Sequence, residues 1–405
     1  MTERDEHDLL AVDAALELIM AQVTPLTAEP VPLPESLGRY LASDLVARID
    51  LPPFRASALD GFAVRHANTP GRLRIVGESA AGAPYDRPLT DGEAVLISTG
   101  AVVPDGADAI VPVEWAPDAS TEAITVREPV GYQNAIREAG SDVKQGAVTL
   151  TAGTCITPAH IGAAAALGLT SVPCSRLPGV SLLATGSELR DPGELLAPGQ
   201  IYNSNTPMLH AALRTAGASV TLYQTAADTG RQHRQVLARA LDHDVLISTG
   251  GVSMGGHDLV RSVMAELGVG ELFWKVAMKP GKPLSFGVRE HPDGRCTLVF
   301  GVPGNPVSAL VCFALFVRPA LAALQSATDP GPHYVAGTLA HSVRADPRRD
   351  QLIRVRRGRG GELEPLRGQQ SHQLAELASS DGLARIRAGA GELEAGTVVD
   401  YLPLF

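Results

Sequence analysis

Carboxylates and lysines in glycine- and proline-rich segments are the residues of this chain best suited to chemistry. The stretch Asp244–Asp258 begins with a short apolar run, Val245–Ile247, continues into a threonine and two glycines, and ends on an aspartate that can cap a helix. A strand, a glycine-rich turn and a helix in this order point backbone N–H groups at an anion. The glycines could simply turn the chain, but Ser253 and Asp258 add side-chain chemistry that a turn does not need.

Charged side chains of both signs accompany this stretch. The cationic candidates are Lys275, Lys279, Lys282 and Arg137. The anionic candidates are Asp60, Asp142, Glu188, Asp228 and Asp258, which we expect on loops at one edge of a sheet. Carboxylates repel a phosphate unless a divalent cation bridges them, so the combination favours Mg²⁺. The plainer interpretation of any single carboxylate is a solvated side chain or, for the Asp-Gly pair at Asp60, an aspartate that satisfies its own turn.

Several enzyme classes are disfavoured by the motifs that the sequence lacks. We find no serine nucleophile elbow, no cysteine–histidine pair and no zinc-ligand spacing. The phosphate-binding pattern GxxxxGK[ST] is missing, and the first strand of the expected α/β domain lacks GxGxxG. The remaining chemistry is positioning and electrostatic stabilisation of an anionic, phosphorylated ligand.

Composition indicates an ordinary globular protein of several domains: 405 residues, 45% hydrophobic and 19% charged. A net charge of −10 and only 4% aromatic residues disfavour nucleic-acid and acidic-membrane surfaces. The cysteines show no metal-ligand spacing, and we expect them to be buried thiols: Cys155, Cys174, Cys296 and Cys312. An acidic start, and the lack of an apolar run of about 18 residues, predict a cytoplasmic protein without a signal peptide or membrane span.

Alternating strands and helices from residue 180 onwards predict a doubly wound, mostly parallel sheet. We expect strands at 180–186, 219–225, 245–248, 273–278, 283–288 and 297–300, and helices at 206–216, 231–241, after 258, and at 306–324. Ligands bind outside the carboxyl ends of such strands. Three polar loops follow strands and should open on the same edge: Thr185-Gly186-Ser187-Glu188, Thr249-Gly250-Gly251 and Gly301–Pro306.

Three smaller regions flank this α/β domain. Helices are expected at 8–23 and 34–41 and from Pro158, with a β-rich region inserted between them, and short strands beyond 332 form a small C-terminal β domain. The expected bounds are 1–45 plus 147–177 for a helical N-terminal domain, 46–146 for the insert, 178–328 for the α/β domain and 329–405 for the last domain. The sequence of residues 96–108 in the insert is similar to that of residues 246–258, which makes Thr99 and Gly100 a second candidate anion loop. The plainer interpretation is that two strand-to-turn transitions have similar residues without a shared function.

Eight motifs, in order, closely resemble those of the molybdopterin molybdenumtransferases, the molybdenum insertases that include the gephyrin E domain. They are LPPFRASALDGFAV, STGAVVPDGADAIVPVE, REAGSDVKQG, ATGSEL, PGQIYNSN, STGGVSMGGHD, MKPGKP and GVPGNPVS. The resemblance spans Ala11 to Leu402 and implies an elongated homodimer of four-domain subunits. It also implies that molybdate is inserted into the dithiolene of adenylylated molybdopterin with Mg²⁺-dependent release of AMP, and that other proteins of molybdenum cofactor synthesis are possible partners.

The resemblance implies roles for individual residues. Asp228 and Asp258 match the carboxylates that hold Mg²⁺ and face the adenylate phosphate. The loop that cradles the pterin nucleotide would comprise Thr249, Gly250, Gly251, Ser253 and Gly255. Asp60, Thr99, Asp142 and Glu188 match residues of the insertion step, the first two contributed by the other subunit. The molybdate site would comprise Lys279, Lys282, Pro283, Ser308, Arg354 and Ser371. Further binding candidates are Gly100, Arg137, Thr185, Gly186, Ser187, Lys275, Pro303, Gly304, Asn305 and Pro306.

The sequence departs from the family pattern at a few positions, and two other functions stay open. The departures are Arg55, Ala56, Leu59, Phe62, Gly256 and His372, of which Gly256 removes a charge near the metal. A non-catalytic scaffold is one alternative, because the same module in gephyrin binds receptor peptides. A molybdopterin adenylyltransferase is the other, because that activity uses a similar α/β domain. The retained aspartates and motif lysines favour an enzyme, and the three flanking domains favour an insertase.

Overall fold

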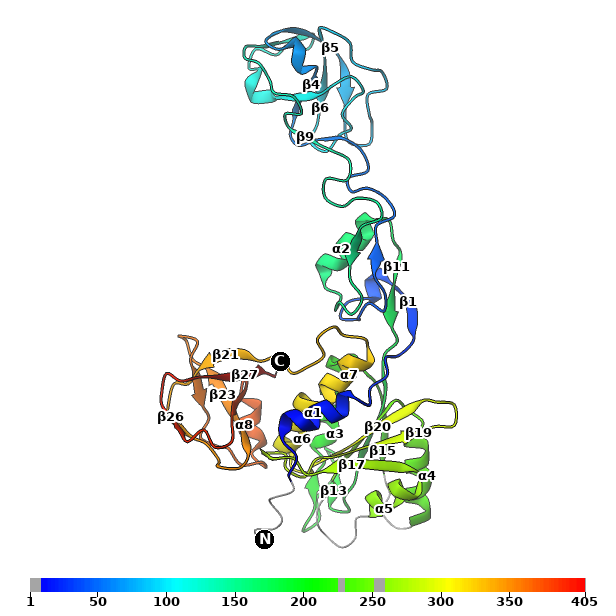
Figure 1. Ribbon diagram of the computed structural model, residues 1–405, viewed down its shortest axis with the longest axis vertical. Helices are drawn as coiled ribbons and strands as arrows, with labels where there is room; N and C mark the ends of the chain where they lie inside the picture. The colour runs from blue at the N-terminus through cyan, green and yellow to red at the C-terminus, as the bar shows by residue number, and fades with distance from the viewer. Residues whose placement is uncertain (1–8, 225–229, 251–258, 405) are drawn as a thin grey trace.

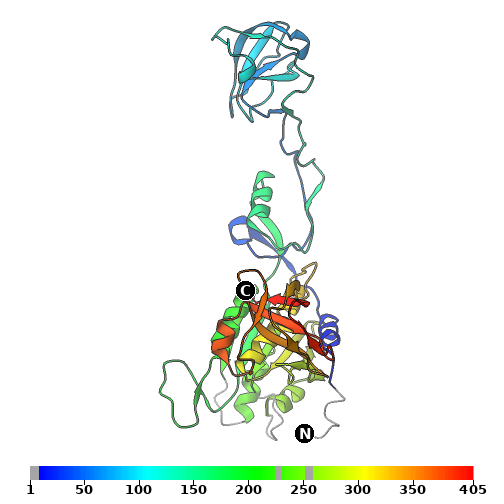
Figure 2. The ribbon, with the colours of Figure 1, turned by 90° about the vertical axis from the view of Figure 1, so that its left-hand side faces the viewer.

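The computed structural model of the chain describes residues 9–224, 230–250 and 259–404. The molecule is elongated, with the β-rich domain at one end, a narrow neck below it, and the α/β and C-terminal domains side by side at the other end (Figures 1 and 2).

The α/β domain is built on a six-stranded sheet in the order β15-β12-β16-β20-β19-β17. Its strands are β12 (Gly179–Ala184), β15 (Ser219–Gln224), β16 (Val245–Thr249), β17 (Val269–Trp274), β19 (Ser285–Glu290) and β20 (Cys296–Val302). The first four in the order are parallel, and β19 runs antiparallel to both of its neighbours. The predicted doubly wound, mostly parallel sheet is therefore confirmed, and β16 is buried along its whole length, as a strand covered on both faces must be.

Helices cover both faces of this sheet. One face packs against α1 (Val12–Met20), α3 (Asn205–Thr215) and the continuous run of α6 (Pro306–Cys312), a π-helical turn (Phe313–Val317) and α7 (Arg318–Leu324). The other face packs against α4 (Gly230–Ala240) and α5 (Leu259–Glu266). Alternate residues of each strand enter the two cores: Ile247 and Phe300 face the first group of helices, and Leu246 and Val299 face the second.

The run from Pro306 to Leu324 corrects one expectation from the sequence. Its 19 residues are long and apolar enough to cross a membrane, whereas we expected no such segment. However, 83% of an apolar 18-residue window of this run is buried inside the protein, where the run forms the central helix of the larger core. A buried core helix explains its composition.

The neck contains the paired strands β1 (Ala28–Pro32) and β11 (Ser171–Ser175), the strands β2 (Leu45–Val46) and β10 (Val148–Leu150), and α2 (Pro158–Ala166). The predicted helix at 34–41 is wrong: the chain makes one 3-10 turn at Leu33–Glu35, and Leu41 then bridges to Cys174. The α2 helix starts at Pro158 as predicted, but α1 packs on α7 and the π-helical turn of the α/β domain.

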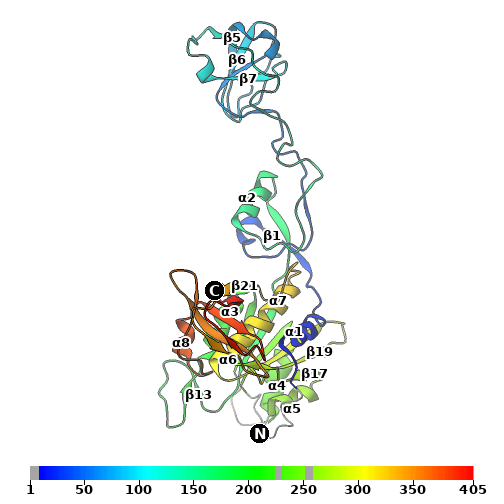
Figure 3. The ribbon, with the colours of Figure 1, turned by 60° about the vertical axis from the view of Figure 1, so that its left-hand side comes forward.

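The β-rich domain holds a five-stranded sheet, β7-β4-β6-β5-β8, and a strand pair, β3-β9. Its strands are β3 (Ala56–Ser57), β4 (Gly61–Val64), β5 (Gly71–Ser79), β6 (Glu93–Ile97), β7 (Ala109–Pro112), β8 (Ala123–Val126) and β9 (Ile136–Arg137), and its 3-10 turns are His66–Asn68 and Val113–Trp115. The two chain crossings of the neck connect this domain to the rest of the molecule (Figure 3).

The C-terminal domain is a sheet of β18-β23-β25-β27-β21, with β24 on the outer half of β23. Its elements are β18 (Met278–Lys279), β21 (Val335–Thr338), β22 (Val343–Arg344), β23 (Asp350–Arg357), β24 (Leu363–Pro365), α8 (Leu374–Ala378), β25 (Gly382–Ile386), β26 (Glu392–Leu393) and β27 (Val398–Pro403). The edge strand β18 comes from the α/β segment of the chain, so the two domains share a sheet. The buried Arg385 also pairs with Asp350 and with Asp13 of α1.

The cysteines divide into two pairs. Cys174 and Cys312 are buried, as expected, but Cys155 and Cys296 are exposed, and all four are free thiols.

Candidate functional site

Three loops meet at the carboxyl ends of the parallel strands. Thr185, after β12, donates its backbone N–H to the carbonyl of Thr249 at 3.1 Å, and Gly250, after β16, donates to the carbonyl of Val302 at 3.3 Å. Of the described residues, the loops that begin at Thr185, Thr249 and Gly301 thus lie on one edge, as the sequence predicts. We call this edge the rim.

Gly250 has a structural reason to be glycine. Its φ is +86°, and a Cβ atom there would lie 2.5 Å from the carbonyl oxygen of Thr185. A side chain would push the first two loops apart, so glycine permits their close approach. A second tight turn, at Gly281, has a φ of +110° and packs against Met278 and Cys312.

Asn205 joins two of the rim loops, and the sequence analysis missed it. Its Nδ2 donates to Thr249 Oγ1 at 2.7 Å and to the carbonyl of Gly304 at 2.7 Å, and the residue is 7% exposed. Ser204 occupies the N-cap position of the following helix, and Asn205 is its first residue. The motif IYNSN ahead of a helix was the available signal.

The guanidinium of Arg354 is buried beside the rim without a salt bridge to any described carboxylate. The residue is 1% exposed on β23; Nη1 donates to the carbonyl of Gln370 at 3.1 Å, Nη2 donates to that of Gly368, and Nε is buried with no partner. Burial lowers the pKa of Arg354 below its usual value. A buried cation that is bonded only to neutral carbonyls favours an anion nearby.

Ser371 connects Arg354 to the rim. Its Oγ accepts a hydrogen bond from Asn305 Nδ2 at 3.0 Å, and its carbonyl accepts one from the backbone N–H of Val307 at 3.2 Å. Asn305 occupies the N-cap position of α6, followed by Pro306, and Ser308 is buried in its first turn. The segment from Gly368 to Ser371 therefore runs from the buried guanidinium to the start of α6.

A cavity of ≈ 330 Å³ lies at the junction of the two domains. Its lining includes Lys279, Arg344, Gln351, Gln369 and Gln370. Lys279 is exposed on β18 and makes no ion pair or side-chain hydrogen bond with the described residues, whereas the Oε1 atom of Gln369 accepts the backbone N–H of Arg354 at 3.0 Å. The cavity thus shares a wall with the Arg354 site, and the sequence analysis missed its arginine and glutamines.

The other two candidate lysines, Lys275 and Lys282, are close to Lys279 in the sequence. Lys282 and Pro283 are half-buried in the turn after β18, and the carbonyl of Lys282 accepts the backbone N–H of Val276 at 2.9 Å. Lys275 has a φ of +77°, and its Nζ lies 4.1 Å from the ring centroid of Trp274.

Thr99 and Gly100, the second candidate anion loop, donate their backbone N–H groups to other parts of the β-rich domain. The carboxylate Oδ1 of Asp60 accepts the Thr99 backbone N–H at 2.6 Å and its hydroxyl at 2.8 Å, and the N–H of Gly100 donates to the carbonyl of Ser57. The backbone N–H groups of both residues and the Thr99 hydroxyl therefore already have acceptors within the protein. The backbone and hydroxyl hydrogen bonds from Thr99 lower the pKa of the exposed Asp60, which stays ionised.

The structure separates the predicted carboxylates within one chain. Asp60 follows β3 in the β-rich domain, whereas Glu188 is exposed on the rim just before β13 (Leu189–Arg190), which pairs with β14 (Ile201–Tyr202). Figure 1 places β4 and β13 at opposite ends of the molecule. Arg137 lies on β9, and Asp142 lies in the connection to the neck. The expectation that all five carboxylates share one edge is wrong for a single chain, because spacing in sequence says nothing about the length of the neck.

Part of the predicted site lies outside the described residues. These positions are Asp228, Gly251, Ser253, Gly255, Gly256 and Asp258. Across residues 9–224, 230–250 and 259–404, no three histidine, cysteine, aspartate or glutamate side chains form a group that could hold a metal ion. Of the described residues, Glu188 with the hydroxyls of Thr185 and Ser187 supplies hard oxygen donors on the rim, the type that Mg²⁺ prefers.

Family models match almost the whole chain. The MoeA N-terminal region (domain I and II) matches residues 10–168, a probable molybdopterin binding domain matches 181–323, and the MoeA C-terminal region (domain IV) matches 336–404.

Full-length relatives agree with these matches. Molybdopterin molybdenumtransferase 2 of Mycobacterium tuberculosis is 38% identical over 393 residues, which cover 94% of this chain and 95% of that protein. A molybdopterin molybdenumtransferase of Staphylococcus aureus is 32% identical and covers 98% of this chain and 96% of its own. The crystal structure of a molybdopterin biosynthesis MoeA protein from Pyrococcus horikoshii superposes with a TM-score of 0.84 at 28% identity, over 98% of this chain and 100% of that one. The chain therefore belongs to the molybdopterin molybdenumtransferase (MoeA) family, transferases of molybdenum cofactor biosynthesis.

Proposed function

We propose that this protein inserts molybdate into the dithiolene of adenylylated molybdopterin, with Mg²⁺-dependent release of AMP. Molybdate binding in this proposal rests on one observation: the guanidinium of Arg354 is buried, and its described hydrogen bonds go to neutral carbonyls and not to a carboxylate. An oxyanion would supply the missing negative charge and accept the unpaired Nε–H.

The groups around Arg354 suit a tetrahedral oxyanion. Ser371 offers a hydroxyl, and Lys279 offers an ammonium that can turn toward the shared wall of the junction cavity. Lys282, Pro283 and Ser308 complete the proposed site. The oxyanion would gain several charge-assisted hydrogen bonds here, each worth about 1.5–3 kcal/mol.

The rim supplies the nucleotide half. The three rim loops, which begin at Thr185, Thr249 and Gly301, would lie along the phosphates of the nucleotide, where close approach of the backbone matters more than side chains. Asp228 and Asp258 would hold Mg²⁺, and Glu188 supplies a further carboxylate on the rim. When bound, the ion would neutralise phosphate charge during release of AMP.

We also propose that the active molecule is a cytoplasmic homodimer. The free thiols of all four cysteines suit a reducing compartment. Asp60, kept ionised by Thr99, lies too far along the molecule to reach its own rim, so it would serve the rim of a second subunit. Other proteins of molybdenum cofactor synthesis would deliver and collect the pterin.

The reaction itself tests the proposed activity. Purified protein, adenylylated molybdopterin, molybdate and Mg²⁺ should give AMP together with a cofactor that activates an apo-molybdoenzyme. Omission of molybdate or of Mg²⁺ is the control. No AMP and no active cofactor from the complete mixture would refute the proposal and leave a scaffold.

Mixed dimers test whether two subunits build one site. Asp60→Asn and Lys279→Ala should each inactivate a homodimer. After subunit exchange, half of the dimers are mixed and each has one intact site, so roughly a quarter of the wild-type activity should return. No recovery in dimers shown to be mixed would place both residues in the same subunit's site.

A further inference from the structure

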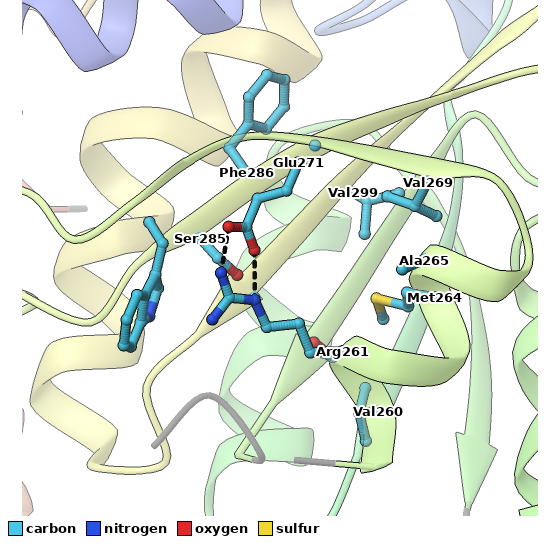
Figure 4. Close-up of a pocket in the computed structure, with 13 residues that line it drawn as sticks. Val260, Arg261, Met264, Ala265, Val269, Glu271, Ser285, Phe286 and Val299 are labelled. Carbon is cyan, nitrogen blue, oxygen red and sulfur yellow. Dashed lines mark hydrogen bonds and ion pairs between the residues drawn. The ribbon is translucent and has the colours of Figure 1, made fainter. Parts of the chain in front are cut away.

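One arginine of the α/β domain already has a carboxylate partner. Arg261 lines a cavity of ≈ 190 Å³ under α5, where its Nε donates to Glu271 Oε2 at 2.6 Å, so an anion bound there would meet a carboxylate (Figure 4). Arg354 differs, because its described hydrogen bonds go to main-chain carbonyls, and the carboxylate of Glu376 acts on it only at longer range. Of these two arginines, Arg354 is therefore the one that can take an oxyanion as its partner.

The groups around Arg354 are mainly hydrogen-bond donors. The ammonium groups of Lys279 and Lys282 can only donate, as can the Nε–H of Arg354, which has no partner among the described residues. The hydroxyls of Ser308 and Ser371 can donate or accept. The nearby carbonyls already accept hydrogen bonds from the protein, namely those of Gly368, Gln370 and Ser371. A ligand that carries a proton of its own therefore finds few acceptors here.

Asn305 fixes the role of the Ser371 hydroxyl. Its Nδ2 donates to Ser371 Oγ at 3.0 Å, and no other hydrogen bond of that hydroxyl is present among the described residues. The serine is held next to the start of α6, because its carbonyl accepts the N–H of Val307 at 3.2 Å. If Oγ also accepted a proton from a ligand, its own proton would be left without a partner, which is unfavourable in a shielded site. Ser371 therefore presents its proton, and not a lone pair, to a bound oxyanion.

Tetrahedral oxyanions differ in whether they carry a proton. At neutral pH molybdate and sulfate carry none, whereas inorganic phosphate keeps at least one hydroxyl group, which needs an acceptor. We propose that the Arg354 site selects unprotonated oxyanions, and that Asn305 is a positioning residue that keeps Ser371 a donor and so excludes phosphate. The inference rests on the proposed function, in which molybdate is the substrate and phosphate is a competitor of the same shape. It assigns specificity to the polarity of the hydrogen bonds.

The wild-type protein gives the first test. At mildly alkaline pH sulfate and phosphate are both dianions of nearly equal size, so the proton of phosphate is the main difference between them. In calorimetric competition against molybdate, sulfate should bind at least about tenfold more tightly than phosphate, because bound phosphate leaves either its own proton or that of Ser371 without an acceptor. Phosphate that binds as tightly as sulfate would overturn the inference.

Asn305→Asp reverses the polarity and keeps the size of the side chain. A carboxylate accepts the Ser371 proton, so Oγ presents lone pairs to the ligand, and the ratio of molybdate affinity to phosphate affinity should fall at least about tenfold. Gln370→Glu is the control, because it adds the same charge one residue from Ser371, in the wall of the junction cavity. Both affinities should fall in the control, with their ratio within about twofold of wild type. An unchanged ratio in folded Asn305→Asp, or an equal change in the control, would overturn the inference.

A double variant shows whether Asn305 acts through Ser371. In a Ser371→Ala background, Asn305→Asp should leave the ratio within about twofold, because the hydroxyl that it would reorient is gone. A change as large as in the single variant would overturn the positioning role. If Asn305→Asp folds poorly, the comparison of sulfate with phosphate still decides. The cofactor-forming reaction, run in parallel, separates the two proposals: selective oxyanion binding without cofactor formation retains the inference and rejects the reaction, whereas cofactor formation that phosphate inhibits as strongly as sulfate does the reverse.

Discussion

Arg354→Met tests the buried cation most sharply. Methionine has a similar length and no charge, so it fills the space without the guanidinium. Arg356, two residues along the same strand, is exposed and donates to the carbonyl of Ser379, so Arg356→Met is a matched control.

The expected effect on molybdate affinity follows from the hydrogen bonds that are lost. One charge-assisted hydrogen bond is worth about 1.5–3 kcal/mol, and about 1.4 kcal/mol is a tenfold change, so Arg354→Met should weaken molybdate binding roughly 10- to 150-fold. The free energy of unfolding should change little. The variant recovers a desolvation cost of several kcal/mol, but it leaves the carbonyls of Gly368 and Gln370 without a donor at about 1–3 kcal/mol each.

Isothermal titration calorimetry with molybdate measures the affinity, and urea unfolding measures the stability. Arg356→Met should match wild type within about twofold in affinity. The reasoning would be refuted if Arg354→Met bound molybdate as wild type does while remaining folded. Equal losses in both arginine variants would instead indicate a general effect of surface charge.

The remaining predictions concern the scaffold of the site. Gly250→Ala should lower the free energy of unfolding by at least about 1–2 kcal/mol because of its positive φ, and should reduce AMP release because the new Cβ atom would meet the carbonyl oxygen of Thr185. Gly270→Ala is the control and should be tolerated, because the atom nearest to its Cβ would be 3.7 Å away. Unfolding curves of the two variants measure the difference. Asp350→Ala should destabilise by about 1.5–3 kcal/mol because it removes the charge-assisted hydrogen bonds that Asp350 accepts from the buried Arg385, which then keeps only Asp13, whereas the exposed Asp400→Ala should cost under about 1 kcal/mol; similar values for both would contradict this account. Burial raises the pKa of Asp244, but hydrogen bonds from Arg176 and Gly179 outweigh it and hold that pKa below its ordinary value, so its stabilisation is present at neutral pH and is lost as the pH falls through the lowered value. Asp244→Asn should flatten that acid dependence in unfolding curves between neutral and acidic pH, and an unchanged profile would exclude this carboxylate as a cause.

The α/β domain could be predicted from sequence because its signals are local. Buried strands such as β16 are short β-branched or aliphatic runs that end in glycine turns, and the helices begin after recognisable caps or prolines. The failed helix at 34–41 depended on distant partners. Its residues carry helical spacing, but Leu41 pairs with Cys174, more than a hundred positions away, and that pairing decides the local structure.

The site was harder to predict than the fold. Arg354 lies in an arginine-rich strand whose spacing resembles a solvated face, and only the docking of the 368–371 segment onto α6 shows that it is buried. Lys279 belongs to β18, a strand from the α/β part of the sequence that pairs with β23 of the C-terminal domain. The hydrophobic periodicity of the sequence does not reveal this pairing between domains. The neck separates the domain that contains Asp60 from the rim (Figure 1), and this separation likewise becomes apparent only in the folded chain.

The central claim is that one oxyanion and one nucleotide bind on either side of the same rim. Crystals soaked with molybdate and AMP, measured at the molybdenum absorption edge, test it directly. The account predicts an anomalous peak within hydrogen-bond distance of Arg354 and Ser371, with AMP density across Thr249 and Gly250. Molybdenum bound elsewhere on the protein, with Arg354 still lacking an anion, would contradict it.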